Sequence, residues 1–324
     1  MAEIKAEKMA TRQAYGKTLV ELGKTTPNLV VMDADLSKST MTAEFGKAYP
    51  ERFFNMGIAE QNLYGTACGL ALSGKVVCAS TFAMFAAGRA FEIIRNSIGY
   101  THANVKICAT HAGITVGEDG ASHQTFEDIA LMRTIPGMTV LNPSDGVSAR
   151  ALIKQAVAFD GPAYIRLGRA AVPPFYTEEM AAKLEIGKGV CLRTGDKKDG
   201  KPADATVIAT GIMVNEAMLA AEELAANGIE VRVIDMHTIK PLDADIIYRA
   251  ARETGAIVTA EEHSVIGGLG SAVAEVTATH YPVKMAMVGQ QDTFGESGKP
   301  DELKAKYGMT AADIVRAVKL LIEA

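Results

Sequence analysis

The chain has 324 residues, and its 33 Lys and Arg against 38 Asp and Glu give a formal net charge of −5. At about 150 residues per domain, this length predicts two domains. The mildly acidic balance argues against nucleic acid or an anionic membrane as the main partner. Hydrophobic residues at 48% and charged residues at 22% exclude disordered and fibrous classes. No apolar run approaches the roughly 18 residues that a membrane span needs.

The N-terminal sequence and the cysteines bear on the cellular compartment. The stretch MAEIKAEKMATRQAYG contains no apolar core of the kind that a secretory signal has. Cys68, Cys78, Cys108 and Cys191 form no Cys-x-x-Cys pair and lie among apolar or small residues. We therefore expect reduced core thiols in a cytoplasmic protein, with neither a disulfide framework nor a metal site.

The first half of the chain alternates short β-branched runs with longer helical stretches. Strands are predicted at 28–33, 75–80, 105–110, 139–141 and 163–166, and helices at 11–24, 58–72, 84–100, 126–133 and 145–159. Strands separated by helices predict a parallel sheet with crossover helices. The strands are continuous apolar runs, which predicts that both faces of the sheet are covered.

The pattern changes near residue 170 and then restarts. A Pro pair and a stretch rich in Gly, Lys and Asp predict a linker over 171–204, with a short hairpin and an exposed turn at 194–202. Strands are then expected at 206–210, 230–235, 256–260 and 283–288, and helices at 214–227, 243–254, 269–279 and 310–323. The sequence thus predicts an α/β fold of two tandem domains with mainly parallel sheets, residues 1–170 and 205–324.

The densest group of chemically unusual residues is the segment 109–124, ATHAGITVGEDGASHQ. It follows a predicted strand, so it lies at the carboxyl end of a parallel sheet, where open α/β folds bind ligands. Glycines raise the entropy lost on folding, so a loop that combines them with acids and with His111 and His123 is costly. The alternative is an ordinary polar loop with turn glycines.

Two shorter segments also stand out. NMGIAEQN at 55–62 places Glu60 at the start of a helix whose small residues would let another backbone approach closely. Alternatively, Glu60 is a first-turn acid that the helix dipole favours. STFAMF at 80–85 places Phe82 and Phe85 three residues apart after a strand, a spacing that ordinarily means core packing.

Together, GIAEQN at 57–62, STFAMF at 80–85 and THAGITVGEDGASHQ at 110–124 resemble the C-terminal half of transketolase, the thiamine-diphosphate enzyme. The resemblance runs from Arg12 to the last helix, with the motifs in the family's order. It implies that the first domain is the pyrimidine-binding domain and the second the family's C-terminal domain.

The resemblance implies residues for the cofactor. Glu60 resembles the glutamate whose carboxyl group contacts the aminopyrimidine and promotes proton transfer there. Phe82 and Phe85 resemble the aromatic wall against that ring, and Asp35 matches a position near the cofactor at a subunit contact. The family's further tyrosine has no clear counterpart, because small residues stand at 87–88.

The resemblance also implies residues for a sugar phosphate. The positions that resemble phosphate-binding residues are Arg12, Ser39, His111 and Arg169, and arginine can bind a phosphate through two parallel hydrogen bonds. Asp119 resembles the residue that reads the configuration of the donor near C2. His123 resembles a histidine that assists the substrate oxygens and proton transfers, so His111 and His123 join Glu60 as expected catalytic residues.

One motif of the family is missing from the sequence. The family binds the diphosphate and a Mg²⁺ or Ca²⁺ ion through Gly-Asp-Gly…Asn, and Gly195-Asp196-Lys197 does not fit this pattern. We therefore expect one subunit of a split transketolase. A separate N-terminal chain would carry the diphosphate-binding domain and ligate the metal, and the two chains would form an α2β2 heterotetramer.

The expected reaction is the transfer of a two-carbon ketol unit between ketose and aldose phosphates, as in the pentose phosphate pathway. The alternatives are a ketoacid dehydrogenase β subunit, a chain like deoxyxylulose-phosphate synthase, and a non-catalytic binding module. The loop VGEDGASHQ favours transketolase, because sugar-phosphate binding explains two histidines and Asp119. The sequence leaves the sugar specificity open.

Overall fold

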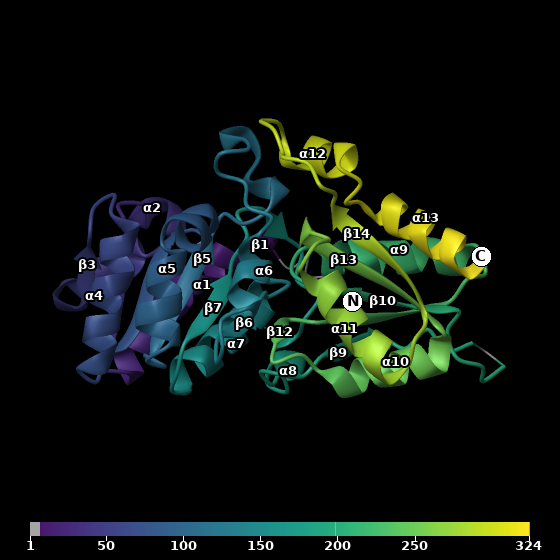
Figure 1. Cartoon of the computed structure of the whole chain (residues 1–324), viewed down its shortest axis with the longest axis horizontal. Helices are drawn as coiled ribbons and strands as arrows, with labels where there is room; N and C mark the ends of the chain where they lie inside the picture. The colour runs from purple at the N-terminus through teal and green to yellow at the C-terminus, as the bar shows by residue number, and fades with distance from the viewer. Residues whose placement is uncertain (1–6, 198, 324) are drawn as a thin grey trace.

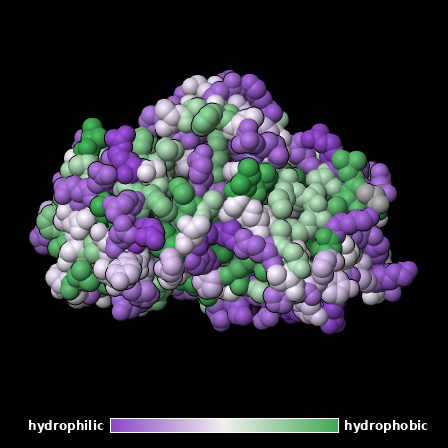
Figure 2. Space-filling model, in the orientation of Figure 1, coloured by the Kyte–Doolittle hydropathy of each residue, from purple (hydrophilic) through white to green (hydrophobic). Residues whose placement is uncertain are grey.

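The computed structural model describes residues 7–197 and 199–323 and contains two α/β domains (Figure 1). The first runs from purple to teal and the second from green to yellow. Each is built on a mainly parallel sheet, so the predicted architecture of two tandem α/β domains is confirmed. In this part of the chain no helix is both long and apolar enough to cross a membrane. Hydrophilic and hydrophobic side chains are intermixed on the face shown in Figure 2.

The first domain contains a seven-stranded sheet in the order β12-β6-β7-β5-β4-β2-β3. Its strands are β2 (Leu29–Asp33), β3 (Phe53–Asn55), β4 (Val76–Phe82), β5 (Val105–Thr110), β6 (Thr139–Leu141), β7 (Ala163–Arg166) and β12 (Thr238–Lys240). All neighbouring strands pair in parallel except β12, which is antiparallel to β6. The second domain therefore contributes an edge strand to the first sheet.

Helices cover both faces of this sheet, as the continuous apolar strands predict. They are α1 (Thr11–Thr25), α2 (Ser37–Thr40), α3 (Ala43–Ala48), α4 (Glu60–Leu72), α5 (Phe91–Ile93), α6 (Asp128–Arg133) and α7 (Gly146–Ala158). Alternate residues of β2 belong to two separate apolar clusters: Val30 and Met32 to one, Leu29 and Val31 to the other. The helix expected over 84–100 is interrupted, because π-helical turns at Phe85–Arg89 and Ile94–Gly99 flank α5. Such turns are common at functional sites.

The second domain contains a five-stranded sheet in the order β14-β13-β10-β11-β9. Its strands are β9 (Val190–Arg193), β10 (Ala205–Ala209), β11 (Val231–Asp235), β13 (Ala256–Ser264) and β14 (Lys284–Gln290). Its helices are α9 (Met213–Ala226), α10 (Ala244–Thr254), α11 (Leu269–His280), α12 (Pro300–Lys306) and α13 (Ala311–Glu323). Strand β13 continues four residues beyond its predicted end and carries Glu261, Glu262 and His263 towards the first domain.

The segment between the domains differs from the prediction. It holds β8 (Ala171–Val172), α8 (Glu178–Ala181) and β9, but β8 pairs with β1 (Met9–Ala10) and β9 with β11. The expected hairpin is therefore wrong: β9 covers the edge of β11, which would otherwise expose unpaired backbone groups. Cys191 on β9 is exposed, so the prediction of a core thiol is wrong there, whereas Cys68, Cys78 and Cys108 are buried.

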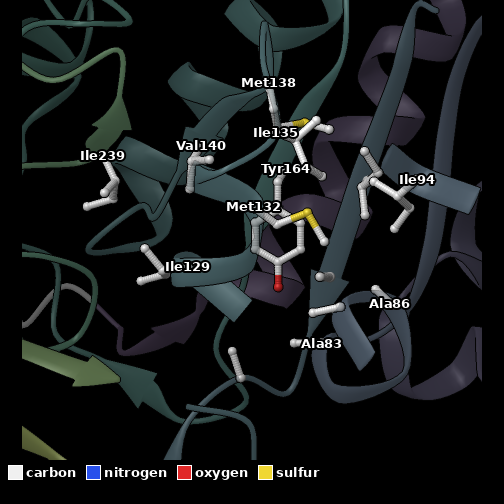
Figure 3. Close-up of a cluster of buried hydrophobic side chains, with 14 of the residues drawn as sticks. Ala83, Ala86, Ile94, Ile129, Met132, Ile135, Met138, Val140, Tyr164 and Ile239 are labelled. Carbon is white, nitrogen blue, oxygen red and sulfur yellow. The ribbon is translucent and has the colours of Figure 1, made fainter. Parts of the chain in front are cut away.

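The two domains share an apolar core, and a buried ion pair of the first domain contacts the second. Figure 3 shows Ile239 of β12 in the same cluster as Ile129 and Val140 of the first domain. Nearby, Asp128 accepts hydrogen bonds from the Arg166 Nε at 2.8 Å and from the Tyr164 hydroxyl at 2.7 Å. Arg166 also donates to the backbone carbonyl of Glu262 at 2.8 Å. This arginine therefore connects β7 to β13.

Replacement of Asp128 by Ala is expected to lower the free energy of unfolding by about 3–5 kcal/mol, because it leaves the buried Arg166 charge without its partner. Burial alone would raise the pKa of Asp128, but Arg166 and His263 hold it below its usual range. The stabilisation is therefore present at neutral pH and is lost as the pH falls below about 4. Urea unfolding of the Asp128→Ala chain measures the loss. Glu179→Ala, which removes an exposed pair with Lys183, should cost less than about 1 kcal/mol.

Candidate functional site

The predicted site residues follow strands that end at one edge of the first sheet. Asp33 ends β2, Phe82 ends β4 and Thr110 ends β5, and these strands are parallel neighbours. Their carboxyl ends therefore meet at the edge where open α/β sheets bind ligands.

Four aromatic side chains from three segments lie together at this edge. The Phe82 ring stacks on His111 at 3.9 Å and on Phe85 at 6.0 Å between centroids. The edge of His123 meets Phe85 at 5.3 Å and Phe82 at 6.2 Å. The structure thus brings together two predicted cofactor residues and two predicted catalytic histidines.

The space beside Gly88, one of the small residues at 87–88, is occupied by a side chain of the same segment. A Cβ atom at Gly88 would lie 2.7 Å from Cε of Met84. The end of the Met84 side chain therefore occupies the space next to residue 88, and a thioether packs well against aromatic rings.

Backbone strain marks His111. Its φ angle is 57°, in the left-handed region that a side chain with a Cβ atom rarely adopts, and such strain costs about 1–3 kcal/mol. The ring is buried and its Nδ1 lies 2.9 Å from the Thr110 hydroxyl. Strain held at such a position is typical of a functional site.

Two arginines face this histidine from separate elements. Arg12, near the start of α1, donates to the Ser39 carbonyl at 2.6 Å. Arg169, which follows β7, donates to the Val116 carbonyl and lies 4.0 Å from an Asp119 carboxylate oxygen. These contacts gather the predicted phosphate-binding residues and Asp119 around the aromatic cluster. The arrangement offers two cations to an anionic ligand.

His111 is expected to stay neutral throughout the physiological pH range. Burial, together with the charges of Arg12, Arg169 and His123, lowers the pKa of His111 to about 3. Because the unfolded chain binds this proton more tightly, stability falls as the pH drops from about 6.5 towards 3. In an NMR titration of the labelled histidines, the His111 resonance is identified by its absence in His111→Gln. This resonance should show no protonation above pH 5. A midpoint near 6.5 would contradict the buried, cation-facing setting.

Glu60 is buried at the first position of α4, with 3% of its surface exposed. Its Oε2 has no hydrogen-bond partner among the described residues, and neither does the buried hydroxyl of Tyr64 one helical turn later. A first-turn acid that only complements the helix dipole would keep its oxygens in water. A buried carboxylate oxygen left without a donor is costly, so this geometry favours a ligand-binding role.

Asp35 lies on an exposed loop beside the segment that leads to Glu60. Its φ angle is 63°, its N–H donates to Asn55 Oδ1 at 3.0 Å, and its Oδ1 accepts from Asn55 Nδ2 at 3.0 Å. Within residues 7–197 and 199–323, no hydrogen bond or ion pair joins Asp35 or Glu60 to the aromatic and cationic residues above. The predicted residues therefore lie along one sheet edge without forming a single hydrogen-bonded network.

Asp33, which is not among the predicted site residues, holds the loop beside the site in place. Its buried carboxylate accepts from the Leu36 N–H at 2.5 Å and from the hydroxyls of Thr40 and Thr42 at 2.6 and 2.9 Å. These bonds fix the loop that carries Asp35 and Ser39. Burial raises the pKa of Asp33, although the hydrogen bonds oppose this. An Asp at the end of an apolar strand was the signal that could have found it.

The comparisons with known proteins identify the family of the chain. The family model "Transketolase, pyrimidine binding domain" matches residues 7–174, and "Transketolase, C-terminal domain" matches residues 197–314. The chain is 52% identical to a putative transketolase C-terminal section of Methanocaldococcus jannaschii, over 95% of this chain and 94% of the relative. It is 42% identical to a 6-deoxy-6-sulfo-D-fructose transketolase subunit of Clostridium sp., over 99% of this chain and 97% of that subunit.

The share of each relative's length that the chain covers differs between split transketolases and relatives about twice as long. A solved split-gene transketolase, the inactive beta4 tetramer, superposes with a TM-score of 0.89 at 56% identity, covering 97% of this chain and 99% of that one. Single-chain relatives are instead matched over only 48–52% of their own length. The chain therefore belongs to the transketolase family and has the extent of the C-terminal section of a split transketolase.

Proposed function

We propose that this chain supplies half of the active site of a transketolase that moves a two-carbon ketol unit between ketose and aldose phosphates, as the pentose phosphate pathway requires. The observation that carries the proposal is the buried carboxylate of Glu60, which has no donor among the described residues and lies at the same sheet edge as Phe82 and Phe85. A carboxyl group and an aromatic wall are what the aminopyrimidine of thiamine diphosphate needs.

The family's domains imply thiamine diphosphate, and the residues present fit it. When bound, this cofactor supplies the nucleophile and the electron sink for carbon–carbon bond cleavage. Glu60 would share a proton with a pyrimidine nitrogen, which its unpartnered oxygen can reach without losing an existing bond. Phe82 and Phe85 would cover one face of the ring and exclude water, and Asp35 would lie near the cofactor at the subunit contact.

The sugar phosphate would lie at the two arginines and the loop 111–124. Arg12, Arg169 and the Ser39 segment would bind the phosphate, and neutral His111 would donate a hydrogen bond without adding charge. Asp119 would read the configuration of the hydroxyl next to the reacting carbonyl. His123, which stands against Phe85, would exchange protons with the substrate oxygens.

A separate chain would bind the diphosphate and the metal ion. Among the residues described, no three His, Cys, Asp or Glu side chains are arranged to hold a metal. The exposed face of α4 suits close contact with another backbone, because a Cβ atom at Gly65 or Gly69 would meet nothing within 4 Å. Ile58 and Leu72, near the two ends of this helix, are 79% and 64% exposed. We propose that the partner packs here and that two copies of each chain assemble.

The direct test combines this chain with a partner that contains Gly-Asp-Gly…Asn, thiamine diphosphate and Mg²⁺. The complex should convert xylulose 5-phosphate and ribose 5-phosphate, whereas absence of turnover would refute the assignment. Pyruvate oxidation with an artificial electron acceptor would instead identify a ketoacid dehydrogenase. Because a relative is named for a sulfonated sugar, 6-deoxy-6-sulfofructose belongs in the assay: two arginines suit a sulfonate as well as a phosphate.

A further inference from the structure

The loop between His111 and His123 is held by the second domain as well as by its own. Figure 1 shows the chain before α12, in yellow, beside this loop, and α12 packs against the 3₁₀ segment Ile114–Asp119. The segment contains predicted substrate residues, so what fixes it also fixes them. The inference that follows rests on the proposed function.

The first attachment is the carboxylate of Glu262 on β13. Its Oε1 accepts the Thr115 N–H at 2.6 Å, and the two residues are 147 positions apart in the chain. A Cβ atom at Gly113 would lie 2.3 Å from the Glu262 carboxyl carbon, and Gly113 has a φ angle of 79°. Arg166 holds the Glu262 backbone carbonyl. The Glu262 carboxyl group therefore lies against the loop, where position 113 has space only for a glycine.

The second attachment is the buried amide of Gln124. Its Nε2 donates to the carbonyls of Ile114 and Gly117, both at 3.3 Å, and to the Glu296 carbonyl of the second domain at 2.9 Å. A Cβ atom at Gly295 would lie 2.0 Å from Gln124 Oε1. The turn before α12 thus closes on the end of the loop opposite Glu262.

Between these attachments the loop meets Arg169. This arginine donates to the carbonyl of Val116, the residue after Thr115, whose N–H Glu262 accepts. It also lies 3.2 Å from a carboxylate oxygen of Glu118 and 4.0 Å from one of Asp119. A shift of the Thr115 amide would therefore move the groups that hold Arg169.

We propose that Glu262, together with the Gly295–Glu296 turn, is a positioning element: the second domain sets the substrate end of the active site through the Thr115 amide and Gln124. The second domain thereby contributes to the affinity of the active site for sugar phosphates. The cofactor end should be affected less, because Glu60 makes no hydrogen bond or ion pair with the loop 111–124 among the described residues. Phe82 and Phe85 touch that loop through ring contacts with His111 and His123.

The test compares variants in the complete complex with the partner chain. Glu262→Ala should raise the KM for the sugar phosphates by about 10- to 100-fold, since misplacement of binding groups by an ångström costs that much. The concentration of thiamine diphosphate that gives half-maximal activity should change much less than the KM. Glu262→Gln keeps an acceptor oxygen for the Thr115 N–H and should restore the KM to near the original value.

Glu261 provides the matched control on the same strand. It is equally buried, but its carboxylate accepts from the N–H groups of Leu269 and Gly270 at 2.7 and 2.8 Å, at the start of α11. Glu261→Ala should lower stability and leave the KM unchanged. Gly295→Ala disturbs Gln124, leaves Glu262 intact and should also raise the KM. It can replace Glu262→Ala in the test if that variant does not fold.

Hydrogen exchange gives a result that does not depend on activity. In Glu262→Ala, peptides spanning 112–119 should exchange faster, while peptides of α4 and β4 keep their protection. An unchanged KM with unchanged exchange would overturn the inference, and so would an equal rise in KM in Glu261→Ala. If the unmodified complex transfers no ketol unit, the proposed function fails and the exchange experiment still decides whether the second domain holds the loop.

Discussion

A complex assembled with Glu60→Gln is expected to lose about 10²- to 10⁴-fold in kcat, the range that a positioned acid–base group contributes. Glutamine has nearly the same shape, so the helix start and the packing of α4 should survive. It cannot share a proton with the pyrimidine nitrogen as a carboxyl group can. The loss should appear at saturating thiamine diphosphate and Mg²⁺, with an additional rise in the cofactor concentration needed for half-maximal activity.

The matched control for Glu60 is Glu44, an exposed first-turn acid of α3. Glu44→Gln should change kcat by less than about twofold, as expected for a surface substitution. If Glu60→Gln retained the activity of the unmodified complex, Glu60 would be only an acid that complements the helix dipole. That result would contradict the assignment of the cofactor site.

Arg12→Ala is expected to reduce kcat/KM for phosphorylated sugars by about 10- to 100-fold, because a hydrogen bond to a charged group contributes about 1.5–3 kcal/mol. The side chain stands over the Ser39 segment, and its charge acts on His111. An unphosphorylated α-hydroxyketone donor should be used equally well by Arg12→Ala and by the unmodified chain. This difference between donors separates phosphate binding from a general loss of structure.

Two further variants complete this experiment. Arg12→Lys should recover only part of the affinity, because an ammonium group lacks the planar fork that binds two phosphate oxygens. Arg150 on α7 is a suitable control, since it pairs with Glu21 of α1 and Glu178 of α8, away from the loop 111–124. Equal losses for both classes of donor in Arg12→Ala would contradict a phosphate-binding role.

The sequence predicted the fold well where one segment is enough to define an element. Continuous apolar runs identified β2, β4, β5, β7 and β10 to within a few residues, because both sides of these strands are buried. It missed β3, β9 and β12, which are three or four residues long and are strands only because a neighbour offers an edge. In β12 that edge belongs to the other domain, so no local pattern could reveal it.

The site shows the same division between local and distant information. His111, Asp119 and His123 lie in one loop, and their unusual composition pointed to them directly. The Glu262 carboxylate contacts this loop from 147 residues away, so its place depends on how the domains pack. The burial of Glu60 and its unpartnered oxygen were also invisible in the sequence, although they distinguish a ligand-binding carboxylate from a helix-dipole acid.

The most direct test of a half-site is cofactor binding measured by isothermal titration calorimetry. Thiamine diphosphate with Mg²⁺ is titrated into this chain, into the partner chain with the Gly-Asp-Gly…Asn motif, and into an equimolar mixture of the two. Tight binding should appear only in the mixture, and Glu60→Gln in the mixture should weaken it. Binding to this chain alone with the affinity of the mixture, or no binding to the mixture, would contradict the account of a shared cofactor site.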